Sequence, residues 1–318
     1  MHSFLHCKLI QNLYHELKID KGKSILLALS SGQDSLCLLK LFIDIQNITD
    51  ITLGIVNIDH QCRQDSTINT KHIGNIIKNL NMPSYIYQLQ PNQYSEAEFR
   101  DMRYQIYINT ALRYSYDMIA TAHTSTDRLE TCLNNLLKGH NFDSLHGLVW
   151  KRKLYCNIDL IRPLLNFTRM EISWFCNYHA LPIWFDYTNL HYQHRRNRIR
   201  YELVPYLQQY YQQDLEKHIT KFLDNTYYDM EYLRQQTIKT YYNIKHPHYI
   251  AINYHILLRQ HVNIQIRVLN LFLTYNGTIT LTEQFINKVL KQLKNNTYSQ
   301  QILFNLRLNI YQSWLYIK

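Results

Sequence analysis

Short apolar runs alternate with amphipathic segments through the first part of the chain. The runs have the composition of buried strands, and they cover residues 24–29, 51–58, 84–89 and 117–122. Apolar residues recur at helical spacing over 3–18, 35–45, 67–80, 97–114 and 127–137. This alternation predicts an α/β fold with a doubly wound, mainly parallel sheet. In such a fold, ligands bind at the carboxyl ends of the strands.

The pattern changes in the second half of the chain. Helical spacing dominates over 167–180, 196–211 and 214–242. His246-Pro247-His248 then interrupts the helical pattern, and two further helical segments are flanked by extended runs at 249–253, 301–308 and 313–317. We therefore expect an α/β domain at residues 1–205, a helical connector at 206–246 and a small α+β domain at 247–318.

The turn after the first strand has the composition of an anion-binding loop. Residues 27–36 read Leu-Ala-Leu-Ser-Ser-Gly-Gln-Asp-Ser-Leu. A strand that enters a helix through small residues presents backbone N–H groups and a helix N-terminus, which bind phosphate. Asp34 would repel a phosphate unless Mg²⁺ lay between them. The loop lacks the Gly-Lys-Ser/Thr ending of a Walker A loop. The alternative interpretation is a plain strand–turn–helix without a ligand.

Charge is distributed unevenly along the chain. The net charge is +10, but residues 1–150 carry 13 basic and 14 acidic side chains, whereas residues 151–318 carry 21 and 10. A near-neutral first half suits a small molecule, and a basic second half suits a polyanion such as nucleic acid. A basic domain without an RNA partner is the alternative.

Cysteine spacing and hydropathy exclude some classes of protein. The 6 cysteines form no C-x-x-C pair, which argues against zinc ribbons and iron–sulfur enzymes and indicates a reducing compartment. No apolar run approaches the roughly 20 residues that a membrane span needs, so we expect no membrane partner.

Polar blocks follow the predicted strands in a fixed order. They are Asp59–Arg63, Ser95–Tyr104, His123–Thr131, Ile161–Leu165, Asp186–Asn189 and Arg195–Arg200. These blocks resemble those of the tRNA(Ile)-lysidine synthetase family over residues 20–205. The loop itself resembles the pyrophosphate loop of the N-type ATP pyrophosphatases. Ser31 replaces the first glycine of that loop, and Thr126 stands where the family usually has the first of two aspartates.

The resemblance implies a reaction and its ligands. Using ATP and Mg²⁺, such an enzyme adenylates the wobble cytidine of tRNA(Ile) with a CAU anticodon. The ε-amino group of free L-lysine then displaces AMP. The modified base pairs with A instead of G, and the tRNA is charged with isoleucine instead of methionine. The small C-terminal domain is expected to position the tRNA.

The resemblance also assigns residues to each ligand. The expected catalytic residues are Asp34, which also binds Mg²⁺, and His123, Asp127, Glu130 and Arg103. Asp127 and Glu130 share one helix face and would bind the ammonium groups of lysine, and Arg103 would bind its carboxylate. The expected ATP-binding residues are Ser30, Ser31, Gly32, Gln33, Asp34, Ser35, Asp59 and His60. The expected tRNA or adenylate contacts are Arg63, Lys138, Arg195, Arg196 and Arg200.

Other interpretations stay open at this point. Asp127 and Glu130 are also typical of a helix N-terminus, and the arginines of a solvated basic face. The whole chain also fits another pyrophosphate-loop synthetase, such as a tRNA thiolase, or a nucleotide-binding module without turnover. For the tyrosines of the basic half, among them Tyr206, core and interface packing is favoured over stacking on RNA bases. We also expect a homodimer that is located in the plastid stroma or the bacterial cytoplasm.

Overall fold

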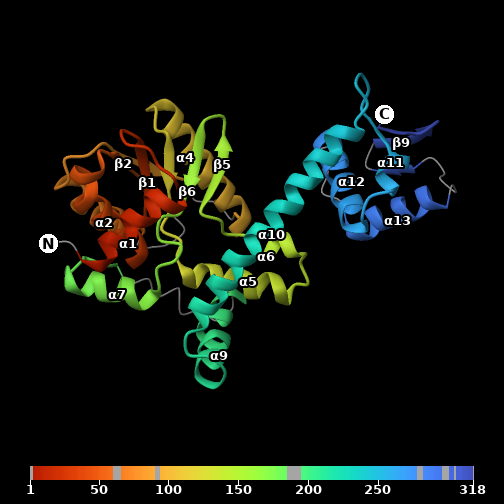
Figure 1. Ribbon diagram of the computed structural model, residues 1–318. Helices are drawn as coiled ribbons and strands as arrows, with labels where there is room; N and C mark the ends of the chain where they lie inside the picture. The colour runs from red at the N-terminus through yellow and green to blue at the C-terminus, as the bar shows by residue number, and fades with distance from the viewer. Residues whose placement is uncertain are drawn as a thin grey trace. The chain divides into compact units, whose positions relative to one another are not determined.

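The computed structural model describes residues 3–59, 66–89, 94–184, 195–277, 282–295, 301–303 and 306–317. The chain divides into two compact units, residues 1–223 and 224–318 (Figure 1). Three predicted features lie outside the described residues, namely His60, Arg63 and the block Asp186–Asn189. The three-part division at 205 and 246 stays a prediction.

The first unit contains a six-stranded sheet and most of the helices. Its strands are β1 (Ser24–Leu29), β2 (Thr52–Asp59), β3 (Ser84–Gln88), β4 (Met118–Ala120), β5 (Lys151–Tyr155) and β6 (Ile158–Ile161). Its helices are α1 (Phe4–Gln11), α2 (Gln33–Thr49), α3 (Ser66–Lys78), α4 (Glu96–Arg113), α5 (Ser125–Leu137), α6 (Phe142–Leu145), α7 (Arg169–Tyr178), α8 (Arg195–Arg198) and α9 (Val204–Tyr210), with π-helical turns η1 (Asn12–Glu16) and η3 (Ile199–Leu203). The long helix α10 (Leu215–Ile244) begins in this unit and continues into the second.

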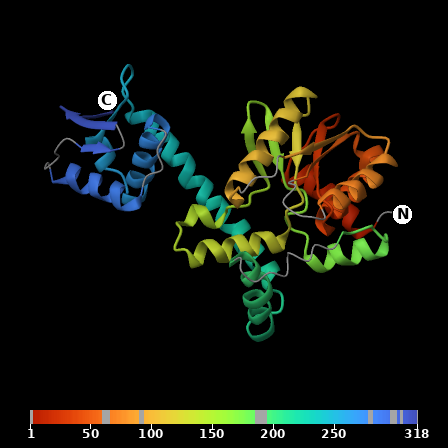
Figure 2. The same ribbon diagram turned by 180° about the vertical axis from the view of Figure 1, so that it is seen from behind.

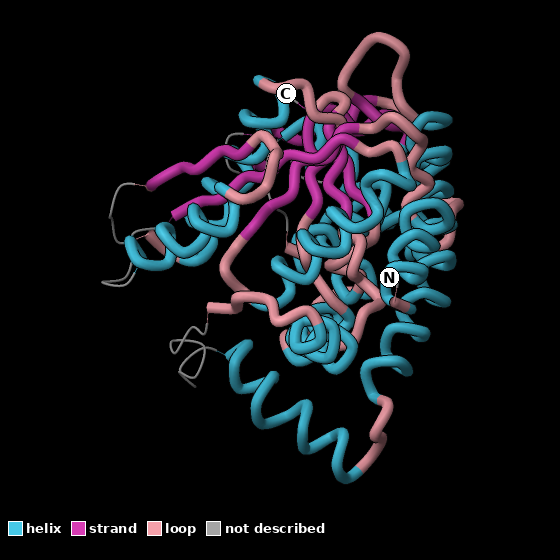
Figure 3. Tube along the Cα trace, turned by 90° about the vertical axis from the view of Figure 1, so that its left-hand side faces the viewer, coloured by secondary structure: helices cyan, strands magenta, loops and turns pink. Residues whose placement is uncertain are grey.

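The sheet confirms the predicted doubly wound fold. Its strand order is β3-β2-β1-β4-β6-β5, and every neighbouring pair is parallel except β5 with β6. The tube view shows these strands side by side with helices packed along them (Figure 3). The pattern analysis did not predict β5 and β6. The charged residues of β5 occupy an exposed edge strand, which hides the apolar alternation on which the prediction depended.

The alternation of β1 explains how the two faces of the sheet are covered. Ile25, Leu27 and Leu29 face a core shared with α1, α2, α3 and α7, whereas Leu26 faces a second core under α4. This is the period-two pattern of a strand that is buried on both sides. Figure 2 shows α4 lying across the sheet, and Figure 1 shows α1, α2 and α7 grouped beside β1 and β2.

The second unit is a small α+β arrangement, as predicted. Besides the end of α10, it contains β7 (Ala251–Asn253), α11 (Tyr254–Leu258), α12 (Val262–Gly277), α13 (Glu283–Lys294), β8 (Gln301–Leu303), β9 (Leu306–Tyr311) and β10 (Trp314–Ile317). Its four strands form an antiparallel sheet in the order β7-β10-β9-β8. An apolar core that includes Phe272, Val289 and Leu315 joins the helices to this sheet. The single run expected at 301–308 is divided between β8 and β9.

None of the helices in the described ranges combines the length and apolar character that crossing a membrane requires.

One buried glycine makes room for the Tyr116 side chain against the sheet. A Cβ added at Gly54 of β2 would lie 1.9 Å from the Tyr116 hydroxyl and 2.5 Å from the adjacent ring carbon. Gly54→Ala should therefore lower the free energy of unfolding by about 1 to 3 kcal/mol. Gly74→Ala is the matched control, because a Cβ there would meet nothing within 4 Å in helix α3. The control should stabilise the chain by up to about 1 kcal/mol. Urea unfolding midpoints of both variants measure the difference, and equal midpoints would contradict the packing described.

Candidate functional site

The candidate site lies where the strand order reverses. The chain builds β1, β2 and β3 in one direction and then returns to place β4 on the other side of β1. The loops that follow β1 and β4 therefore diverge at the carboxyl edge of the sheet and leave a crevice for ligands between them. The first loop carries residues 30–34, and the second carries His123 and leads into α5.

Hydroxyl groups hold the loop after β1 in shape. The Ser35 hydroxyl lies 2.6 Å from the Ser30 carbonyl oxygen and 3.0 Å from that of Gly32. The Ser30 backbone N–H donates to the Ser35 hydroxyl at 3.2 Å, and the Gly32 N–H donates to the Ser30 hydroxyl at 3.3 Å. Ser31 is buried, and its carbonyl oxygen accepts from the backbone N–H of Trp184 at 3.1 Å. The loop is therefore a preformed turn that leads into α2.

Gly32 is not required by its own backbone. Its φ of −74° is open to any residue, and an added Cβ would lie 3.4 Å from the Ser30 side-chain oxygen, which is ordinary contact. Gly32 also occupies the N-cap of α2, where unbonded N–H groups point out of the helix. Because glycine has no side chain, it leaves those N–H groups open to a ligand.

Asp34 is the carboxylate of this loop that lacks a partner. Among the described residues it makes no hydrogen bond or ion pair. Burial and the nearby Asp127 carboxylate raise the pKa of Asp34 to about 6, against the opposing effect of Arg169 and Arg200. A carboxylate whose pKa is raised by burial and by a neighbouring negative charge is stabilised in its ionised form by a bound cation. Mg²⁺ usually takes one or two protein carboxylates and completes its shell with substrate phosphates and water. Asp34 fits this mode.

The second loop leads into a capped helix. The backbone N–H of Thr124 donates to the Asp127 carboxylate at 2.9 Å, and the Thr124 hydroxyl lies 3.2 Å from the same oxygen. The Ser125 hydroxyl donates to the Phe167 carbonyl at 2.8 Å and lies 3.0 Å from Glu216 of α10. The first turn of α5 is therefore fixed by the elements around it. The helix N-terminal interpretation of Asp127 is confirmed, because this carboxylate is part of the cap.

Asp127 and Glu130 are also the acidic half of an ion cluster. Arg196 donates to Glu130 through Nε at 2.8 Å and to Asp127 through Nη2 at 2.6 Å. Arg200 donates to Glu130 through Nε, and its Nη2 lies 3.5 Å from Asp127. The Glu130 side chain is 0% exposed and that of Asp127 is 12% exposed. Burial alone would raise the pKa of Asp127, but Arg196, His123, the Thr124 N–H and Arg200 hold it below its ordinary value.

The structure thus gives Arg196 and Arg200 a role that was not predicted. They were expected to contact tRNA or adenylate, and the structure places both against the carboxylates that were expected to bind lysine. The sequence signalled this pairing only through the opposite charges of the arginines and the carboxylates and through the helical spacing within each pair.

His123 lies directly before α5 as a neutral side chain. Its Nδ1 is 2.9 Å from the Thr121 hydroxyl oxygen. Burial lowers the pKa of His123 to about 4, and the charges of Arg162, Arg196 and Arg100 act in the same direction against that of Asp127. The imidazole is therefore uncharged at neutral pH. Within the described ranges no hydrogen bond engages its Nε2, which is therefore available to a ligand.

Two further residues belong to this edge of the sheet, although the site prediction omitted them. Arg162 follows β6 and is 1% exposed, and its Nη1 donates to the Val149 carbonyl at 2.6 Å. Its buried Nε has no hydrogen-bond partner among the described residues, and burial lowers the pKa of the guanidinium group. Glu216 accepts from the Thr126 hydroxyl at 3.1 Å, so a carboxylate lies beside the position at which the family usually has an aspartate.

The remaining predicted residues lie on other elements or at the far end of α5. Asp59 is buried at the end of β2 and accepts from the Thr70 hydroxyl at 2.7 Å. Arg103 lies on α4, and in the described part of the chain no hydrogen bond or ion pair joins it to Asp127 or Glu130. Lys138 caps the far end of α5. At about 1.5 Å per residue, that end lies about 16 Å along the helix from Asp127.

Comparisons with known proteins agree with this geometry. A family model described as a PP-loop domain, an ATP-binding domain, matches residues 5–207. The chloroplastic tRNA(Ile)-lysidine synthase of Gracilaria tenuistipitata var. liui is 40% identical over 319 residues, which cover 100% of this chain and 99% of that protein. The chain belongs to the tRNA(Ile)-lysidine synthase family of PP-loop proteins. The resemblance inferred from the loop and the polar blocks is thereby confirmed.

Two other relatives support this assignment, and one solved structure supports the fold. The chloroplastic enzyme of Pyropia yezoensis is 32% identical and covers 99% of this chain, and the enzyme of a Nostoc species is 40% identical over 231 residues, or 73% of this chain. The U34-tRNA thiolase NcsA of Methanococcus maripaludis superposes with a TM-score of 0.56 over 69% of this chain and 77% of its own. Its sequence is only 13% identical, so it supports the fold alone.

The ion cluster should show strong coupling between its two arginines. Either Arg196→Gln or Arg200→Gln leaves one guanidinium group to compensate the buried carboxylates, and each should cost about 1 to 2 kcal/mol. The double variant leaves both carboxylates without a cation and should cost more than the sum of the single variants, because an uncompensated buried charge costs about 3 to 5 kcal/mol. Urea unfolding of the four proteins measures this coupling.

The control for this cycle is Arg198→Gln. Arg198 is 64% exposed and pairs with Glu202 at 3.2 Å, so its replacement should cost less than about 1 kcal/mol. Strictly additive losses in the double variant would show that the two arginines do not share the carboxylates.

Proposed function

We propose that the chain is a tRNA(Ile)-lysidine synthase. In this reaction ATP adenylates the wobble cytidine of a CAU-anticodon tRNA at the oxygen on carbon 2, releasing pyrophosphate. The ε-amino group of L-lysine then forms a bond to that carbon as the bond to the adenylate oxygen breaks, and AMP leaves. The observation that carries the proposal is the buried pair Asp127 and Glu130 next to a preformed pyrophosphate loop. It combines a site for a cationic amine with a site for a nucleotide.

The loop after β1 is assigned to the pyrophosphate of ATP. The N–H groups at the start of α2 and the hydroxyls of Ser30 and Ser35 supply hydrogen bonds to phosphate oxygens. Asp34 would hold Mg²⁺, and the metal would neutralise the charge of the leaving pyrophosphate. Neutral His123, with Nδ1 on Thr121, is assigned a hydrogen bond from Nε2 to the transferred phosphate.

The α5 carboxylates are assigned to the substrate lysine by exchange of partners. A lysine ammonium group needs the anionic environment that Arg196 and Arg200 now neutralise. Arg196 is the better candidate for release, since its side chain is 49% exposed whereas that of Arg200 is 25% exposed. The released guanidinium group would then be available to the adenylate, as the original assignment of Arg196 to tRNA or adenylate requires. Glu130 is proposed to accept a proton from the attacking amine.

Several parts of the expectation remain proposals of the same kind. Arg103 is proposed for the lysine carboxylate, and Lys138, Arg195 and the second unit for the tRNA. We place the enzyme in the plastid stroma or the bacterial cytoplasm, because relatives named chloroplastic and others from cyanobacteria match the chain. Assembly as a homodimer is also part of the proposal.

Transfer of labelled lysine tests the proposed reaction. The purified chain is incubated with Mg-ATP, labelled L-lysine and a CAU-anticodon tRNA(Ile) transcript. We expect label in a modified nucleoside of this RNA and none in a control transcript with uridine at the wobble position. Asp34→Asn should abolish transfer by removing the metal ligand. Glu130→Gln should retain tRNA-dependent release of pyrophosphate while lysine transfer falls.

The outcomes separate the candidate functions. Cleavage of ATP without lysine transfer would indicate a pyrophosphate-loop synthetase with another acceptor. Binding of ATP and RNA without turnover would indicate a module that lacks catalysis. Either result would overturn the proposed reaction.

A further inference from the structure

A groove opens in the first unit on the far side of the arginine segment. Its volume is about 680 Å³, and its lining residues are Leu137, Arg195, Arg198, Ile199, Glu202, Leu203 and Tyr206. These residues come from the end of α5 and from the continuous run α8, η3 and α9. The volume falls within the range of sites that hold small organic groups.

The segment 195–200 presents its arginines in two directions. Arg196 and Arg200, four positions apart, bind the carboxylates of Asp127 and Glu130. Arg195 and Arg198, three positions apart, line the groove. Residues at these spacings share a helix face, so one short segment separates the ion cluster from the groove. The diameter of a helix with its side chains is only about 10 to 12 Å.

The groove combines an apolar floor with an exposed aromatic ring. Ile199 is buried, whereas Leu137 and Tyr206 are 56% and 52% exposed. The Tyr206 ring lies 4.9 Å from that of Tyr210, which is itself exposed. The preferred sequence interpretation assigned such tyrosines to core and interface packing. Core packing within this chain is wrong for Tyr206 and Tyr210, since both side chains are exposed, and interface packing stays a prediction.

The charge at the groove is positive. Among the described residues Arg195 makes no ion pair, and Arg198 is paired only with Glu202, at the lining of the groove. Lys138 follows Leu137 directly in the chain. Aromatic rings beside cationic side chains are the recurring means of binding unpaired nucleotides, in which the ring stacks on the base and the cation binds the phosphate.

We propose that this groove binds an unpaired RNA base next to the nucleotide that is modified. The base stacks on Tyr206 over the apolar floor, and its phosphate lies against Arg195. The inference rests on the proposed function, which brings a single-stranded anticodon loop to the neighbouring ion cluster. It adds a second contact that selects a loop by the stacking of its bases.

A fluorescent base analogue tests the groove directly. An RNA hairpin with the CAU loop is made with 2-aminopurine in place of the anticodon adenine, and the full-length chain is titrated into it. We expect stacking on Tyr206 to quench the fluorescence. Tyr206→Ala should abolish the quenching and weaken binding roughly five-fold to a hundred-fold, whereas Tyr206→Phe should retain both.

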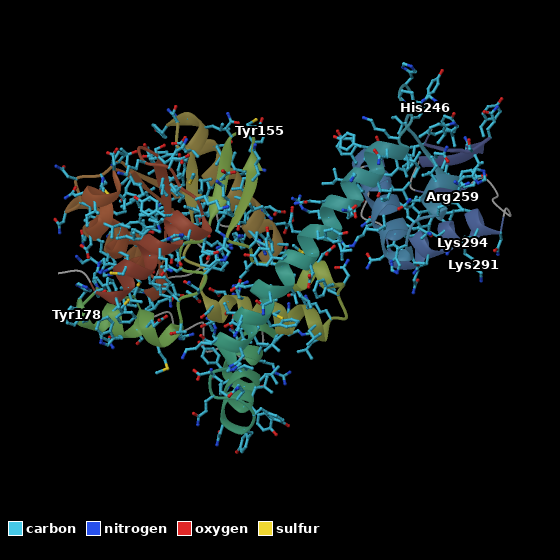
Figure 4. The ribbon with its side chains drawn as sticks, in the orientation of Figure 1. Tyr155, Tyr178, His246, Arg259, Lys291 and Lys294 are labelled. Atoms are coloured by element: carbon cyan, nitrogen blue, oxygen red, sulfur yellow. The ribbon has the colours of Figure 1, made fainter. Side chains whose placement is uncertain are left out.

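The matched control is Tyr155→Ala. Tyr155 is 53% exposed on β5, and Figure 4 labels it at the end of the first unit opposite α9. The control should bind and quench like the parent chain. Arg195→Gln should reduce the slope of affinity against salt concentration by about one phosphate contact. Comparable far-ultraviolet circular dichroism of all variants establishes that they are folded.

The result distinguishes this inference from the proposed reaction. If the parent chain transfers lysine to the tRNA but Tyr206→Ala quenches and binds normally, the groove assignment is overturned and the reaction stands. If the parent chain shows no quenching, the groove has another occupant and the assignment also fails. Quenching that depends on Tyr206 in a chain that transfers no lysine would support an RNA site and overturn only the reaction.

Discussion

The burial of two carboxylates on α5 is the constraint from which the candidate site follows. Glu130 is completely covered, and an ionised carboxylate in that position is stable only with cations and hydrogen bonds around it. Arg196 and Arg200 supply both, and this pairing attaches segment 195–203 to α5. Apolar contacts of Leu129 with Ile199 and Val204 continue the attachment. With those contacts made, the remaining arginines of the segment face the groove.

Acidic and basic side chains occupy different parts of the carboxyl edge of the sheet. The carboxylates Asp34, Asp127 and Glu130 interact with one another strongly enough to contribute to the raised pKa of Asp34. On the β6 side, Arg162 and Arg100 contribute to the lowered pKa of His123. An edge divided in this way suits a metal-bound pyrophosphate near Asp34 and an anionic adenylate near His123. Arg162 has no carboxylate partner in the described structure, and its buried guanidinium group is held by the Val149 carbonyl and the Tyr104 side chain.

Much of the fold was predictable because its signals are local. The runs that form β1 to β4, the loop at Ser30–Ser35 and the helical face of Asp127 and Glu130 depend on neighbours within a few positions. The strands β5 and β6 were missed because one is a charged edge and the other carries Asp159 within its four residues. The partners of Arg196 and the contact between Thr126 and Glu216 were missed for a different reason. They join residues 66 to 90 positions apart, and a pattern in one segment does not specify such contacts.

In the proposed reaction, the substrate lysine and Arg196 compete for the same carboxylates. The most direct measurement is the KM for lysine of Arg196→Gln and of the parent chain, with Mg-ATP and CAU-anticodon tRNA saturating. Removal of the competing guanidinium group should lower the KM for lysine, while kcat falls because the adenylate loses a contact. A KM that is unchanged or raised in the variant would contradict partner exchange at Asp127 and Glu130.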